Sequence, residues 1–230
     1  MKTITFLFCL LLSAVSLYSE EGIEYRGIDV KVRDGNGYRH ITVKRERAQE
    51  CQKLAPGTML VWGGSYAGSM VPDACKKTFV CTLGKNIHPI KMAKEIETYG
   101  VLEVLKFMEE MQKDDNKVLV DARREPWYNH RTIPGAVNMP YYYFHNRAYY
   151  KDEFAYAMRY LGGIKKKEGG YRFEHPKTIL VFCNGPWCSL SSKFVKALEE
   201  EGYPMKHIKW FRGGMQAWLI ANMTTTRPVQ

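Results

Sequence analysis

The stretch Thr178-Ile179-Leu180-Val181-Phe182-Cys183-Asn184-Gly185-Pro186-Trp187-Cys188-Ser189 decides the fold. Its first five residues form a short apolar run, which is typical of a strand buried on both faces of a parallel sheet. A loop follows, and the next segment has the apolar spacing of a helix, at Leu190, Phe194, Val195 and Leu198. The stretch is therefore predicted to form a strand, a tight loop and a helix.

The same alternation occurs earlier in the chain. A short β segment is predicted at residues 96–98, a helical stretch follows with apolar residues from Leu102 to Met108, and residues 118–120 form a second apolar strand. Strands that alternate with helices indicate a parallel sheet covered on both faces. The fold class is therefore predicted to be α/β.

The loop after the strand is the strongest candidate for a reactive site. A strand-loop-helix junction points several backbone N–H groups and the positive end of the helix dipole into one small concavity. A thiol at Cys183 would ionise more easily there, and Asn184, Gly185, Trp187 and Ser189 would hold an anionic ligand. The alternative is an inert buried thiol that continues the strand.

Residues 94–221 resemble the rhodanese family. Three motifs in the same order carry the resemblance: Val118-Leu119-Val120-Asp121-Ala122-Arg123 followed by Trp127-Tyr128; Ile133 to Pro140; and the cysteine loop with Gly202-Tyr203 and Phe211 to Trp218. The resemblance implies a rhodanese-like fold and a sulfurtransferase or persulfide carrier without a cofactor. In the family the cysteine takes sulfane sulfur from thiosulfate or another donor, such as polysulfide, and passes it to a thiol acceptor.

Asp121 and Arg123 follow a central strand at the sheet edge where open α/β sheets gather binding residues. They are substrate-binding candidates, and a structural ion pair is the equal alternative. The loop length matches the six-residue loop of rhodaneses rather than the longer, arginine-closed loop of related phosphatases, which favours sulfur over phosphate.

Two residues depart from the family pattern. Cys188 stands where many active sulfurtransferases have arginine, and Pro186 has no N–H to offer an anion. Cys188 would be a second catalytic residue if it attacked a persulfide on Cys183 and formed a disulfide. The alternatives are therefore a periplasmic thiol-disulfide redox protein that uses Cys183 and Cys188, or a non-catalytic rhodanese-like binding module.

The N-terminus has the pattern of a secretory signal peptide, with Lys2 before an apolar run and small residues up to Ser19. Removing residues 1–19 takes away one lysine and no acid, so the net charge falls from +10 to +9. Export to the periplasm is predicted, without membrane insertion after cleavage. A basic exported protein suits small sulfur anions and a periplasmic redox partner, and export argues against nucleic acid.

The predicted extension, residues 20–93, contains a β-hairpin around residues 34–37 and a Gly- and Pro-rich loop over residues 55–86. Residues 222–230 form a tail. Five cysteines remain after cleavage: 51, 75, 81, 183 and 188. A Cys75–Cys81 disulfide is favoured over a metal site that includes His88, and Cys51 could replace either partner.

Overall fold

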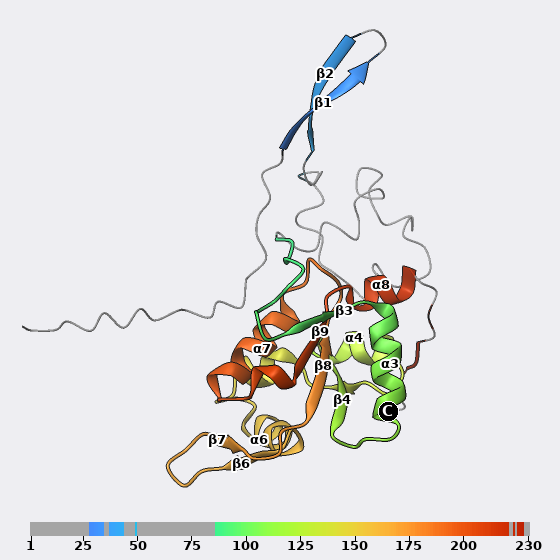
Figure 1. Cartoon of the computed structure of the whole chain (residues 1–230). Coiled ribbons are helices and arrows are strands. Elements are labelled where there is room, and N and C mark those ends of the chain that lie inside the picture. The colour runs from blue at the N-terminus through green and yellow to red at the C-terminus, as the bar shows by residue number, and fades with distance from the viewer. Residues whose placement is uncertain are drawn as a thin grey trace, which may run out of the picture.

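Five parallel strands form the central sheet, in the order β3-β9-β8-β4-β5 (Figure 1). The computed structural model describes residues 28–34, 37–43, 49, 86–220, 223 and 225–227. The strands are β3 (Glu97–Tyr99), β4 (Lys117–Asp121), β5 (Val137–Asn138), β8 (Thr178–Phe182) and β9 (Ile208–Phe211).

Strand β8 has the bounds that the apolar run predicts. It lies between β4 and β9, where Val181 pairs with Val120 on one side and Trp210 on the other. A strand in this position is covered on both faces, which explains why all five of its residues are uncharged and four of them are fully buried. The strand ends at Phe182 and thereby places Cys183 at the carboxyl edge of the sheet.

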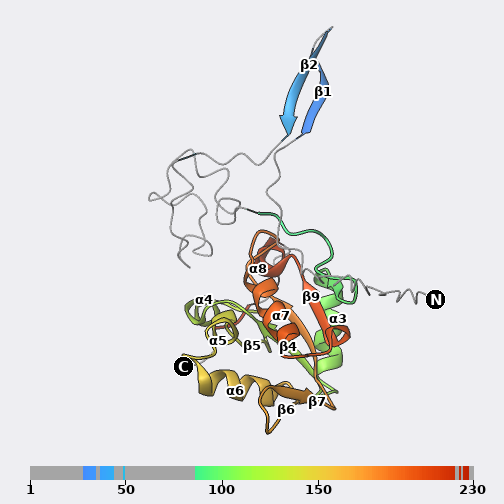
Figure 2. The same cartoon turned by 90° about the vertical axis from the view of Figure 1, so that its left-hand side faces the viewer.

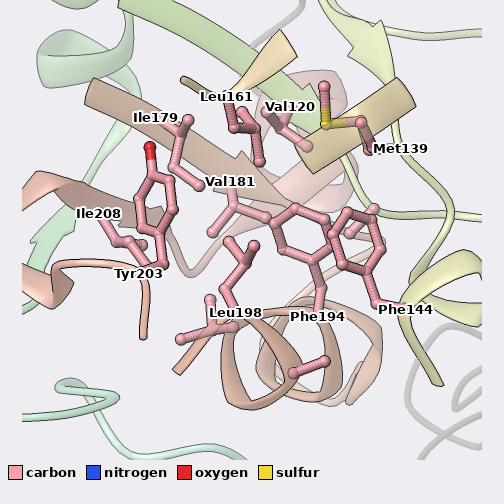
Figure 3. Packing of buried hydrophobic residues seen from close by; sticks show 14 of the residues in the cluster. Val120, Met139, Phe144, Leu161, Ile179, Val181, Phe194, Leu198, Tyr203 and Ile208 are labelled. Atoms are coloured by element: carbon pink, nitrogen blue, oxygen red, sulfur yellow. The ribbon is translucent and has the colours of Figure 1, made fainter. Parts of the chain in front are cut away.

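One face of the sheet is covered by α5 (Tyr141–His145), α6 (Lys151–Tyr160) and α7 (Leu190–Glu200). Because strand side chains alternate between the two faces, Ile179 and Val181 point to this side. They pack with Phe194 and Leu198 of α7, as Figure 3 shows. The predicted apolar face of the helix is thereby confirmed.

The opposite face is covered by α3 (Val101–Met111), α4 (Glu125–His130) and α8 (Gly214–Ile220). Leu180 and Phe182 alternate with the residues above and pack here with Phe107 and Trp218. Figure 1 shows α7 and α3 on opposite sides of the strands. The prediction of a parallel sheet with helices on both faces is therefore confirmed.

Helix α7, which begins directly after the loop of residues 183–189, ends in a glycine-based capping motif. Gly202 has φ +79°, and the N–H of Tyr203 donates to the carbonyl of Leu198 at 2.9 Å, while the N–H of Gly202 donates to Glu199. These two bonds satisfy carbonyls that the last turn leaves without helical partners.

Two hairpins lie outside the central sheet. Strands β1 (Ile28–Asp34) and β2 (Gly37–Val43) pair antiparallel with Asp34 opposite Gly37, which confirms the predicted N-terminal hairpin. Strands β6 (Gly163–Lys165) and β7 (Tyr171–Phe173) form the second hairpin, beside α6 in Figure 2. A 3-10 helix, η3, spans Met205–His207.

The predicted signal peptide, the loop over residues 55–86 except its last residue, and Cys51, Cys75 and Cys81 lie outside the described residues. The last part of the predicted extension is described, and it packs with the domain: Met92 is 1% exposed and belongs to the core under α7. Among the described residues, no helix is long and apolar enough to cross a membrane.

Candidate active site

The candidate site is the loop of residues 183–189 between β8 and α7. Cys183, Asn184, Gly185 and Cys188 are buried, Pro186 and Trp187 are half-buried, and Ser189 is exposed where it begins the helix. The predicted loop residues thus lie together, with both thiols on the inner side of the loop.

Helix α8 holds the first part of this loop through its backbone. The N–H of Met215 donates to the carbonyl of Cys183 at 3.0 Å, and the N–H of Gln216 donates to Asn184 at 2.9 Å. Gly214 has φ +52°, and a Cβ there would lie 2.2 Å from the carbonyl oxygen of Cys183. Only glycine permits this approach, so Gly214 has a direct role in shaping the loop.

Trp187 anchors the outer part of the loop. Its indole N–H donates to Oε1 of Gln216 at 2.8 Å, and a Cβ on Gly185 would lie 2.7 Å from the same oxygen. The N–H of Cys188 closes the turn on the carbonyl of Gly185 at 2.9 Å. Trp187, predicted to bind substrate, therefore uses its polar atom to fix the loop.

A segment before the sheet covers the same loop. The N–H of His88 donates to the carbonyl of Pro186 at 2.8 Å, and the guanidinium of Arg212 donates to the carbonyls of His88 and of Pro89, at 3.1 and 2.8 Å from Nε. The imidazole of His88 meets the indole of Trp210 edge-on, with ring centroids 6.1 Å apart. Neither His88 nor Arg212 was predicted as a site residue.

Asp121 and Arg123 form a completely buried ion pair below the loop. Nη2 of Arg123 lies 2.6 Å from Oδ2 of Asp121, and the same nitrogen donates to the carbonyl of Arg131 at 2.6 Å. Thr132 donates its hydroxyl to Asp121 at 2.7 Å. Nη1 of Arg123 also lies 3.4 Å from Oδ1 of Asn184, a long contact that reaches the loop. The pair thus lies next to the loop and is neutral as a whole.

The sulfur of Cys183 sits among hydrogen-bonding groups from the start of α7. Its Sγ lies 3.4 Å from the hydroxyl oxygen of Ser191 and 3.3 Å from the carbonyl oxygen of Cys188. The indole N–H of Trp210 donates to the same Ser191 oxygen at 3.1 Å. Because an indole N–H only donates, the Ser191 oxygen accepts this bond, and the hydroxyl proton stays available for donation to a thiolate at Cys183. Ser191 and Trp210 were not predicted as site residues.

These contacts decide the ionisation of Cys183. Burial is the largest influence and opposes ionisation, but hydrogen bonds outweigh it: from the Cys188 thiol, from the Ser191 hydroxyl, and from the backbone N–H groups of Ser191 and Gly185. Together they lower the pKa of Cys183 to about 7. These donors are all uncharged groups, so hydrogen bonding rather than a neighbouring cation stabilises the thiolate.

Cys188 shows the opposite behaviour. Burial raises the pKa of its thiol, and both the hydrogen bond it donates to Cys183 and the nearby thiolate charge raise it further. Both cysteines are unbridged. The loop therefore combines a readily ionised thiol with a second thiol that stays protonated beside it. Among the described residues, no three His, Cys, Asp or Glu side chains are grouped so that they could hold a metal ion.

The model of the Rhodanese-like domain family matches residues 104–221, and 34 solved chains also match. No curated protein sequence matches. One of the solved structures is a rhodanese-like domain from Anabaena sp., with 21% sequence identity, coverage of 59% of this chain and 81% of that chain, and a TM-score of 0.38. Another is an uncharacterised protein from Saccharomyces cerevisiae, with 22% identity, coverage of 55% of this chain and 92% of that chain, and a TM-score of 0.39. A third is a thiosulfate sulfurtransferase from Pseudomonas aeruginosa, with 17% identity, coverage of 60% of this chain and 21% of that chain, and a TM-score of 0.38.

The family model begins inside α3 and ends just after α8, so it includes the cysteine loop and the helix that holds it. Since it spans more than half of the sequence, the chain belongs to the rhodanese-like domain family.

Proposed function

We propose that this protein carries sulfane sulfur as a persulfide on Cys183, in the periplasm, and passes it to a thiol acceptor. The observation that supports the proposal is the hydrogen bonding at the sulfur of Cys183: the Ser191 hydroxyl lies 3.4 Å from Sγ, and such bonds lower the pKa of the thiol to about 7 although burial opposes ionisation. The thiolate is the nucleophilic form of cysteine. A loop that served only as a binding surface would not need an easily ionised thiol.

The proposed reaction has two steps. The Cys183 thiolate attacks the sulfane sulfur of the donor, the donor's S–S bond breaks, and the leaving group departs with the electron pair, as sulfite when the donor is thiosulfate. The outer sulfur then bears the negative charge. In the second step an acceptor thiolate attacks this outer sulfur, and Cys183 leaves as a thiolate again.

The surroundings of Cys183 should hold thiosulfate only weakly. The charge of Arg123 is neutralised by Asp121, and the position five residues after the nucleophile holds the neutral Cys188. Pro186 offers no N–H to an anion. A doubly charged donor would therefore meet neutral hydrogen-bond donors rather than a cation.

Mass spectrometry of one tryptic peptide tests the proposal. Trypsin cleaves after Lys177 and Lys193, so residues 178–193 form a peptide that contains Cys183 and Cys188 and no other cysteine. The reduced protein is incubated with thiosulfate or polysulfide, alkylated and digested. In the Cys188→Ser variant the peptide should gain sulfur, and Cys183→Ser should abolish the gain. Absence of added sulfur with both donors would contradict the proposal.

A further inference from the structure

The sulfur-transfer steps above make no use of the Cys188 thiol, although Cys188 lies against the reacting sulfur: its carbonyl oxygen is 3.3 Å from Sγ of Cys183. Cys188 is 5% exposed, and its thiol donates a hydrogen bond to the sulfur of Cys183. Its backbone is fixed by the bond from its N–H to the carbonyl of Gly185. A second thiol that is held in contact with a nucleophile is placed to react with whatever the nucleophile carries.

The opposite pKa shifts of the two thiols are those of an attacking and a resolving cysteine. Cys183 ionises first and takes part in chemistry with the donor, while Cys188 stays a thiol as long as the neighbouring sulfur is a thiolate. Once Cys183 carries a persulfide, the negative charge lies on the outer sulfur instead of on Sγ. The outer sulfur then can accept the proton of Cys188, and the Cys188 thiolate faces a neutral Sγ.

Access to Cys183 favours this internal reaction over transfer to a large acceptor. Cys183 is only 2% exposed, so an external thiol has to approach the outer sulfur at an enclosed position, whereas Cys188 is part of the same loop and its carbonyl oxygen lies 3.3 Å from Sγ. Two groups held in contact react as though one were present at very high concentration, up to about 10⁵ M or more in well-oriented systems. The internal thiol therefore has the advantage wherever the two compete.

We propose that Cys188 resolves the Cys183 persulfide, which makes the protein a reductase that converts sulfane sulfur to hydrogen sulfide. This rests on the proposed persulfide on Cys183. The Cys188 thiolate attacks Sγ of Cys183, the bond from Sγ to the outer sulfur breaks, and the outer sulfur leaves with the electron pair as HS⁻. The two cysteine thiols are oxidised to a disulfide, and the sulfane sulfur is reduced. A dithiol protein resets the site by thiol-disulfide exchange.

The experiment compares wild type, Cys188→Ser, Cys188→Ala and Cys183→Ser, each reduced and kept free of oxygen. One equivalent of polysulfide is added, sulfide is measured, and the alkylated tryptic peptide 178–193 is analysed. Wild type should contain the Cys183–Cys188 disulfide and release more sulfide than the variants. Cys188→Ser and Cys188→Ala should retain the persulfide, at a level roughly tenfold or more above wild type.

The controls separate failure of the inference from failure of the proposed function. Cys183→Ser should form neither persulfide nor disulfide, and circular dichroism and thermal unfolding verify that each variant is folded. If wild type accumulates as much persulfide as Cys188→Ser and forms no disulfide, the resolving role is wrong while persulfide carriage stands. If no variant gains sulfur and wild type forms no disulfide, both are wrong.

Discussion

Replacing Ser191 by alanine should raise the pKa of Cys183 without changing the access of a small alkylating reagent to the Cys183 sulfur. The Ser191 hydroxyl lies 3.4 Å from Sγ, and the indole of Trp210 orients it by donating to its oxygen. A hydrogen bond to a charged group contributes about 1.5–3 kcal/mol, and one pKa unit corresponds to about 1.4 kcal/mol. The substitution should therefore raise the pKa by about 1–2 units.

The pH dependence of iodoacetamide alkylation, followed on peptide 178–193, measures this shift. Starting from a pKa of about 7, the thiolate fraction at pH 7 should fall from about half to about one tenth or less, and alkylation should slow roughly fivefold or more. Because the thiolate forms as the pH rises, the rates of wild type and Ser191→Ala should converge at alkaline pH.

Ser192→Ala is the matched control. Ser192 is the next residue of α7 and is also buried, but its hydroxyl donates to the carbonyl of Ser189 at 3.0 Å. This variant should keep the alkylation midpoint of wild type. If Ser191→Ala keeps it too, or if its rate stays low at alkaline pH, the Ser191 hydroxyl does not stabilise the thiolate in the way the geometry implies.

Substitutions at Gly214 and Asp121, with Gly202→Ala as a control, test the support of the loop. Gly214→Ala should destabilise the fold and reduce alkylation of Cys183, because the added Cβ would lie 2.2 Å from the carbonyl oxygen of Cys183. Gly202→Ala has φ +79° and no atom within 4 Å of the added Cβ. It should lower the free energy of unfolding only by the backbone strain of about 1–2 kcal/mol and leave alkylation unchanged. Thermal unfolding and alkylation rates measure both, and equal behaviour of the two variants would contradict the role of Gly214. Asp121→Ala should lower the free energy of unfolding in urea by about 3–5 kcal/mol, since it leaves Arg123 charged and buried without its partner; a loss below about 1 kcal/mol would contradict this.

The elements of the sheet could be predicted because their patterns are local. The apolar run at residues 178–182 and the helical spacing of Phe194 and Leu198 reflect burial between neighbouring layers, and the structure places both as expected. The hairpin around Asp34 and Gly37 likewise depends on turn residues that are adjacent in the chain.

The polar contacts of the site could not be predicted in the same way, because they join residues that lie far apart in the sequence. Ser191 has no distinguishing local pattern, and its importance comes from Trp210 and from the sulfur beside it. His88 meets the loop through its backbone N–H, which any residue except proline would offer. Gln216 lies within the Phe211 to Trp218 motif, but the motif alone does not indicate that its side chain contacts Trp187 of the loop.

The surroundings of the cysteine are completed by residues from the last part of the domain. Arg212 joins the carbonyl of His88 from a position 124 residues away, and Trp210 and Met215 act on the cysteine loop from the last part of the domain. A chain is made from its N-terminus, and contacts between distant residues form late in folding. A chain that ends before Trp210 therefore lacks the indole that orients the Ser191 hydroxyl and the backbone N–H that holds the Cys183 carbonyl. The thiol should reach its full reactivity only once the last strand and helix of the domain are in place.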